Sequence, residues 1–106
     1  MIARVWHGRT DVARADEYTK YLQETGVIDL RKTPGNRGVT ILCDRSGPAA
    51  HFTLISFWDS VESIRKFAGQ DVLKARYYPK DREFLHALEP QVQHLEVEVK
   101  EGPLFG

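Results

Sequence analysis

The 106-residue sequence contains a single cysteine, Cys43, and no long apolar run. One cysteine excludes an intrachain disulfide and a thiolate-rich metal site built from one chain, and it favours a reducing compartment. The opening segment MIARVWHGRT lacks the apolar stretch of a signal peptide, and nothing approaches the roughly 20 apolar residues of a membrane span. We therefore expect a cytoplasmic protein that has no membrane partner.

Net charge is also missing, because 15 Lys and Arg residues balance 15 Asp and Glu residues. That balance gives no broad basic surface for nucleic acid, so nucleic acid is not an expected partner. The chain has no glycine-rich phosphate loop and no zinc-binding helix motif, and its four histidines are scattered. No metal site is expected.

Apolar residues make up 42% of the chain, which fits one globular domain over residues 1–106. Strands are predicted where apolar or β-branched residues alternate: 2–8, the two arms of a hairpin spanning 38–59, and 92–100. Helical spacing predicts helices over 11–25 and 60–69, with short helical turns at 70–78 and 81–88. Gly26 is expected to end the first helix and to open a polar loop that leads to the hairpin.

The order β-α-β-β-α-β predicts an α+β, ferredoxin-like fold, in which helices cover one face of a four-stranded antiparallel sheet. The predicted strands carry apolar side chains on both faces. Because the second face also needs a cover, we expect a homodimer that packs sheet against sheet.

The motif RVWHG near the start places Trp6 and His7 on opposite faces of the first strand. We expect His7, which shares its face with Ala3 and Val5, to line a cavity on the helix side, and Trp6 to pack in the dimer. An imidazole with a pKa near neutrality suits proton transfer. The alternative is a structural histidine that is bonded to backbone or faces the dimer seam.

The runs SFWDSVESIRKFAG, ARYYPKDREFL and HLEVEV, together with RVWHG, resemble the antibiotic biosynthesis monooxygenase family of the dimeric α+β barrel superfamily. The resemblance covers nearly the whole chain. It implies a dimeric barrel and a cofactor-independent monooxygenase that acts on an aromatic or polyketide-like molecule. The superfamily also includes haem-degrading monooxygenases, cyclases and isomerases, so the fold does not settle the activity.

The family's monooxygenases use a tryptophan at the end of the third strand, which Trp58 matches, and a nearby asparagine. No asparagine lies on this strand, and the only one in the chain is Asn36 in a loop. Haem-degrading relatives use a histidine ligand where this chain has Arg76 and Tyr77, although His86 follows soon after. These departures keep two alternatives open: a non-oxidative cyclase or isomerase with a histidine base, and a non-catalytic, stress-related protein that binds a small molecule.

The candidate catalytic residues are His7, as the proton-transfer group, and Trp58, which would orient the substrate ring or else simply fill the core. The candidate substrate-binding residues are aromatic, imidazole or guanidinium side chains placed near the expected pocket: Tyr18, His51, Arg76, Tyr77 and Tyr78. Arg76 would hold an anionic substrate group, or else be solvated or paired with Asp81.

Overall fold

The computed structural model describes residues 1–106 and contains one four-stranded antiparallel sheet, in the order β2-β3-β1-β4. The strands are β1 (Ile2–Asp11), β2 (Asn36–Asp44), β3 (Ala49–Trp58) and β4 (Gln93–Glu96). β1 and β3, along which apolar residues alternate, are the two central strands. Each of them is hydrogen-bonded to a neighbouring strand on both sides. The predicted ferredoxin-like order is confirmed.

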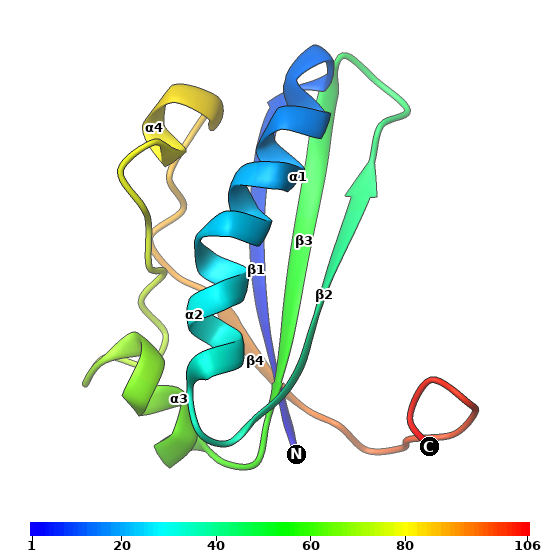
Figure 1. Cartoon of the computed structure of the whole chain (residues 1–106), viewed down its shortest axis with the longest axis vertical. Helices are drawn as coiled ribbons and strands as arrows, with labels where there is room; N and C mark the ends of the chain where they lie inside the picture. Colours follow the sequence, from blue (N-terminus) through cyan, green and yellow to red (C-terminus); the bar gives the residue numbers. More distant parts are fainter.

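The helices all lie on one face of the sheet (Figure 1). They are the 3₁₀ turn η1 (Val12–Arg14), α1 (Ala15–Glu24), α2 (Gly26–Lys32), α3 (Val61–Ala68) and α4 (Asp81–Phe84). In Figure 1, α1 and α2 form a nearly continuous rod along the sheet, and α3 and α4 lie beside opposite ends of that rod. Residues 70–80, here called the strap, connect α3 to α4 along the side of the rod.

The prediction of a polar loop after Gly26 is wrong, because the helix α2 occupies Gly26–Lys32. The break between α1 and α2 is confined to Thr25, whose backbone lies at φ −120° and ψ −91° and whose hydroxyl donates to the carbonyl of Tyr21 at 2.7 Å. The helical direction then resumes because Leu30 is buried in the core and extends the apolar stripe of α1. Gly26 itself lies against the ring of Tyr78.

The hairpin and α3 follow the sequence prediction closely, because short-range signals define them. Ser60 caps α3 by accepting a hydrogen bond from the Ser63 N–H at 3.2 Å. Gly69 ends the helix with φ 89°, a conformation that glycine adopts without steric cost.

The later part of the chain is less regular than predicted. The strap contains no helix, so the helical turn predicted at 70–78 is wrong; instead Lys74 forms an isolated bridge with Gln91. The turn predicted at 81–88 is reduced to the four residues of α4, and the final strand is reduced to Gln93–Glu96. Pairing with β1 ends there, which leaves the later residues as an irregular tail.

The pairing register decides which face each residue of RVWHG occupies. Trp6 lies opposite Leu54, and His7 lies opposite Thr53. Leu54 belongs to the helix-covered core, so Trp6 faces the helices and His7 faces the other side. Gly8 makes room for this arrangement, because a Cβ at this position would come within 2.5 Å of the indole of Trp6.

The core fills the space between the sheet and the helices, with Tyr18, Phe52, Trp58 and Ile64 among its fully buried members. The opposite side, here called the helix-free face, is also rich in apolar residues. Leu42 and Leu95 are about half exposed there, at 51% and 49%. Phe105 from the tail packs edge to face on Phe57 and covers part of this surface. None of the helices has the length and apolar character needed to cross a lipid bilayer.

Candidate functional site

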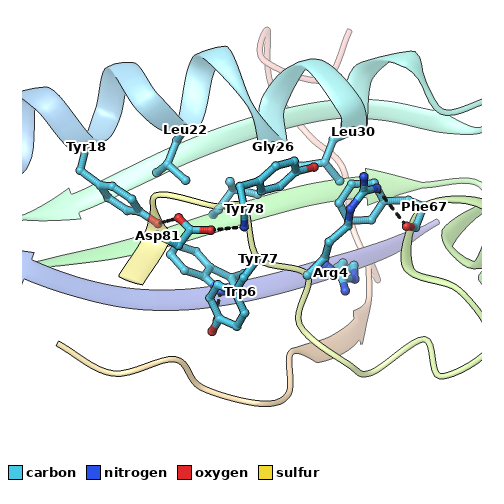
Figure 2. Close-up of a pocket in the computed structure, with 12 residues that line it drawn as sticks. Arg4, Trp6, Tyr18, Leu22, Gly26, Leu30, Phe67, Tyr77, Tyr78 and Asp81 are labelled. Atoms are coloured by element: carbon cyan, nitrogen blue, oxygen red, sulfur yellow. Dashed lines mark hydrogen bonds between the residues drawn. The ribbon is translucent and has the colours of Figure 1, made fainter. Parts of the chain in front are cut away.

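A small cavity lies between the sheet and the helices, and three of the four tyrosines line it (Figure 2). Its volume is about 40 Å³, which suits a few water molecules. The sheet, α1 and α2 contribute Arg4, Trp6, Leu54, Tyr18, Leu22, Gly26 and Leu30. The remaining wall comes from α3, the strap and α4, which contribute Phe67, Arg76, Tyr77, Tyr78 and Asp81.

Trp6 and Tyr77 form one wall, although 71 positions separate them in the sequence. Their rings meet edge to face with centroids 6.3 Å apart, and Trp6 Nε1 donates to the Tyr77 hydroxyl oxygen at 3.3 Å. The Tyr77 hydroxyl donates in turn to the carbonyl of Glu89 at 2.6 Å. Burial raises the pKa of Tyr77, so this phenol stays protonated at neutral pH. The pair therefore offers a flat aromatic surface with one polar edge.

Asp81 supplies a buried carboxylate at one end of the cavity, with only 3% of the residue exposed. Its Oδ1 accepts from the Tyr18 hydroxyl at 2.8 Å, and its Oδ2 accepts from the Tyr78 backbone N–H at 2.6 Å. Burial and the nearby charge of Asp81 raise the pKa of Tyr18, so Tyr18 remains a hydrogen-bond donor. These two bonds fix the carboxylate, and each oxygen keeps a further lone pair.

Arg4 lies toward the other end of the cavity in Figure 2, close to Phe67. The residue is 5% exposed, and its Nη2 donates to the carbonyl of Lys74 at 2.9 Å. Burial lowers the pKa of Arg4 to about 10, which leaves the guanidinium charged at neutral pH. Arg76 approaches the same Phe67 ring, with its guanidinium carbon 4.8 Å from the ring centroid. Two cations therefore border the cavity at this end.

Tyr78 and Arg76 tie the strap to α2 through one acidic residue. The Tyr78 hydroxyl donates to Asp29 Oδ2 at 2.7 Å, and Arg76 Nη2 lies 3.3 Å from the same oxygen. Burial, followed by the bond to Asp29, raises the pKa of Tyr78. These contacts hold the aromatic side chains of the strap inside the cavity.

The structure brings together four of the five residues predicted to bind substrate: Tyr18, Arg76, Tyr77 and Tyr78 all line the cavity. Their roles as ligand contacts stay predictions. Arg76 pairs with Asp29 and not with Asp81, because the strap places Arg76 beside α2.

The prediction that His7 lines a cavity on the helix side is wrong. Its Nδ1 lies 2.6 Å from Glu89 Oε2 on the helix-free face, and its ring stacks on His51 with centroids 5.7 Å apart. Neither histidine lines the cavity. The small residues beside His7 suggested a cavity, but the burial of Trp6 determines the orientation of the strand because the larger apolar ring gains more from burial. A catalytic role for His7 stays a prediction, and it would require a reaction on the helix-free face.

Trp58 is fully buried beneath α3 and does not line the cavity. Its Nε1 donates to the Ser56 hydroxyl at 2.9 Å, and its ring lies 6.3 Å from that of Phe67, centroid to centroid. Trp58 thus supports a wall residue from behind. The core-filling alternative describes this position, and the role in orienting a substrate ring stays a prediction.

Sequence reasoning missed Arg4, Trp6 and Asp81 as cavity residues. One signal was present for the first two: they share a strand face with Ile2, and that face carries the largest apolar side chain of β1. Asp81 gave no such signal, because its contact with Tyr18 spans 63 positions. Its burial depends on where the irregular strap ends.

A larger hollow of about 490 Å³ lies on the helix-free face, between β2, Phe57 and the tail. Its rim includes Leu104, which is 89% exposed, and it contains no buried charged group. The charged residues that line this hollow, Arg37 and Lys100, are exposed to solvent. The smaller cavity combines apolar walls with buried polar groups, so we take it as the candidate site. No three His, Cys, Asp or Glu side chains gather anywhere in a way that could hold a metal ion.

His94, the β4 partner of Arg4, gives the stability of the fold a testable pH dependence. Burial and the neighbouring charge of Arg4 lower the pKa of His94 below its usual value of about 6.5. The unfolded chain then binds this proton more readily than the folded chain, so stability is complete above about pH 6.5 and decreases as the pH falls through the lowered pKa. Urea titrations should show a shallower acid loss for His94→Gln than for the wild type. Parallel profiles would contradict this.

No protein-family model and no curated protein matches the sequence. Solved structures do match the fold. The heme-degrader MhuD from Mycobacterium tuberculosis, determined with two hemes bound in its active site, superposes with a TM-score of 0.64 and 16% identity over 96% of this chain and 100% of that one. A point mutant of MhuD, with two manganese protoporphyrin IX molecules bound per active site, superposes with a TM-score of 0.62. The two sequences are 14% identical over 96% of this chain and 99% of that one. At these identities the match shows a shared ferredoxin-like α+β fold.

Proposed function

We propose that the chain is a cofactor-independent monooxygenase of the antibiotic biosynthesis monooxygenase type, acting on an aromatic or polyketide-like molecule in the cavity. The observation that carries this proposal is Asp81, a buried carboxylate in the wall of an aromatic-lined cavity. A carboxylate that is fixed in position beside a bound substrate can act as a general base and take a proton from it. The fold shared with a heme-degrading enzyme adds support.

The proposed reaction begins when Asp81 takes a proton from an acidic C–H or phenol of the substrate. Tyr18 and the Tyr78 N–H hold the carboxylate in position during this step. The resulting electron-rich anion reduces dioxygen. In the balanced reaction, a CH₂ group and O₂ give a carbonyl group and water: one oxygen enters the substrate, and the other leaves with the two hydrogens. The substrate supplies all four electrons, so the reaction needs no external reductant.

A substrate would enter by displacing the strap. Small-molecule pockets usually measure about 300 Å³ or more, so a cavity of about 40 Å³ is a closed form. The strap lacks helix and strand, and the hydrogen bonds of Tyr77 to Glu89 and of Tyr78 to Asp29 hold its side chains in place. Opening would break these bonds together with those that Arg4 and Arg76 make to the strap and to α2, whereas the pairing of β1 with β3 would stay intact.

The cavity residues do not fit haem. No histidine or cysteine lines the cavity, and Arg76 is a cation that does not ligate iron. Tyrosine binds haem iron as a phenolate, but burial raises the pKa of both Tyr77 and Tyr78. His86 lies outside the cavity, with Nε2 2.8 Å from Asp11. The reaction proposed for this cavity therefore involves no haem.

We also propose that the chain forms a two-fold dimer through its helix-free face. Leu42, Ile55, Phe57 and Leu95 make this face apolar, and a sheet face of this kind is unfavourable in water. Light scattering at micromolar concentration should give twice the 12.1 kDa chain mass. Leu42→Lys should shift the mass toward the monomer, whereas Leu73→Lys, a matched change on the exposed strap, should not. A monomeric wild type would contradict the proposal.

Oxygen uptake tests the proposed activity directly. An anthrone, whose CH₂ group lies between two aromatic rings, is incubated with the protein in an oxygen electrode, and the product is identified by mass spectrometry. We expect consumption of one O₂ per quinone formed, with oxygen from labelled O₂ in the product. Conversion without O₂ uptake would favour a cyclase or isomerase. Binding without conversion would favour a non-catalytic binding protein, and either result would contradict the monooxygenase.

A further inference from the structure

Arg4 is a buried cation without a counter-ion. Its one hydrogen bond within the chain is donated by Nη2 to the Lys74 carbonyl, and its buried Nε has no partner. No carboxylate lies within ion-pair distance of the guanidinium, which instead lies 5.4 Å from the centroid of the Phe67 ring. A buried and unpaired charge is unfavourable for folding. Its presence in the wall of a cavity therefore indicates a partner that is not part of the chain.

His94 provides a second unsatisfied group beside Arg4. The two residues are Cα partners in the β1–β4 ladder, so their side chains lie on the same, helix-covered face of the sheet. His94 Nε2 is buried and also has no hydrogen-bond partner. Only these two side-chain atoms in the chain are both buried and unpartnered, and they belong to neighbouring residues. Two unsatisfied nitrogen atoms on paired residues of neighbouring strands can both donate to oxygen atoms of a ligand.

The rest of the cavity limits what can carry those oxygen atoms. Figure 2 shows Arg4 toward one end and the Tyr18–Asp81 pair toward the other, with the rings of Trp6 and Tyr77 between them. Aromatic walls favour a flat ring system. The acidic end disfavours a second anionic group, so the negative charge of a ligand belongs at the Arg4 end.

We propose that Arg4, assisted by His94, binds the carboxylate of an aromatic acid and thereby selects aromatic carboxylates as the substrate class of the cavity. This inference rests on the proposed function, because it assigns the substrate of the same site. The planar guanidinium fits a carboxylate through two parallel hydrogen bonds. In this orientation the ring system lies against Trp6, and its far end points toward Asp81.

The test compares naphthoate with naphthamide, which has nearly the same shape and no charge. Isothermal titration of the wild type should show naphthoate binding at least about tenfold more tightly than naphthamide, since hydrogen bonds to charged groups are the stronger kind. Arg4→Met should remove this preference: the dissociation constant of naphthoate should rise, and that of naphthamide should stay within about threefold of the wild-type value. Arg45→Met removes the same charge from an exposed ion pair with Asp16, and it should change the affinity for neither compound.

Thermal unfolding without ligand provides a second readout. Replacing an unpaired buried charge by an apolar side chain of similar length should raise the unfolding midpoint of Arg4→Met by about 4 °C or more. Such a gain in stability together with a loss of carboxylate preference would support a binding role, because a structural arginine would show the opposite change in stability. A lower midpoint for Arg4→Met, or a carboxylate preference that survives the change, would overturn the inference.

Binding of the two compounds to the wild type tests the carboxylate contact and the aromatic site separately. Equal binding of naphthoate and naphthamide to the wild type would overturn the carboxylate inference and leave the aromatic site intact. Failure of both compounds to bind would overturn the inference and would also count against the proposed function.

Discussion

Replacing Asp81 by asparagine should lower the rate of substrate oxidation by about 10²–10⁴-fold, the usual contribution of a general base. Asparagine has nearly the same shape, and its carbonyl oxygen still accepts from the Tyr18 hydroxyl. The asparagine side chain cannot take up a proton at neutral pH. Its NH₂ group, which replaces Oδ2, cannot accept the hydrogen bond from the Tyr78 N–H. The measurement is the initial rate of oxygen uptake at saturating anthrone, with circular dichroism to show that the variant is folded.

Two controls make the Asp81 result specific. Asp16→Asn removes a carboxylate whose side chain is 92% exposed and should leave the rate unchanged. His7→Ala tests the catalytic role predicted from the sequence. Loss of turnover in His7→Ala with full turnover in Asp81→Asn would move the reaction to the helix-free face and contradict the assignment of Asp81.

Replacing Trp58 by alanine should lower the free energy of unfolding by about 3–5 kcal/mol, the range found when large buried aromatic residues are truncated. Trp58 is fully buried, packs near Phe67, and is the donor to the Ser56 hydroxyl. Because small domains have a total stability of about 5–15 kcal/mol, this loss is a large fraction of the whole and should clearly lower the urea midpoint. Urea titration followed by circular dichroism measures the change.

Trp58→Phe separates packing from substrate contact. It keeps an aromatic ring and loses the hydrogen bond to Ser56, so we expect a smaller loss, about 1–2 kcal/mol. If Trp58 also orients the substrate, as its position in the sequence suggests, this variant should raise the dissociation constant of an aromatic ligand. Near-normal stability of Trp58→Ala would contradict the position described for this residue.

The sequence predicts those parts of the fold that depend on neighbouring residues. The hairpin follows from β-branched residues on both sides of a turn, and α3 follows from the Ser60 cap and Gly69. α2 was missed because Gly26 and the later Pro34–Gly35 pair are typical of a loop. The burial of Leu30, which makes this segment helical, is a tertiary effect.

The candidate site is less predictable because long-range contacts create it. The aromatic residues of the strap could be recognised from their type alone as candidate binding residues, and the structure places them in the cavity wall. The Trp6–Tyr77 and Tyr18–Asp81 hydrogen bonds span 71 and 63 positions. The residues around each of these side chains give no local signal that predicts its partner. The orientation of Trp6 and His7 was reversed for the same reason: alternation separates the two residues, but only the pairing with β3 decides which one faces the helices.

The central claim is that ligands bind between the sheet and the helices, and the two tryptophans report on it directly. Trp6 lines the cavity, with its indole N–H bonded to Tyr77, whereas the indole N–H of Trp58 is bonded to Ser56 behind the cavity wall. A ¹H–¹⁵N NMR spectrum should therefore show two indole signals, assigned with Trp6→Phe. On titration with naphthoate, we predict a large shift of the Trp6 signal and little change at the His7 and His51 imidazoles. An unmoved Trp6 signal together with shifted imidazole signals would place the ligand on the helix-free face and contradict this account.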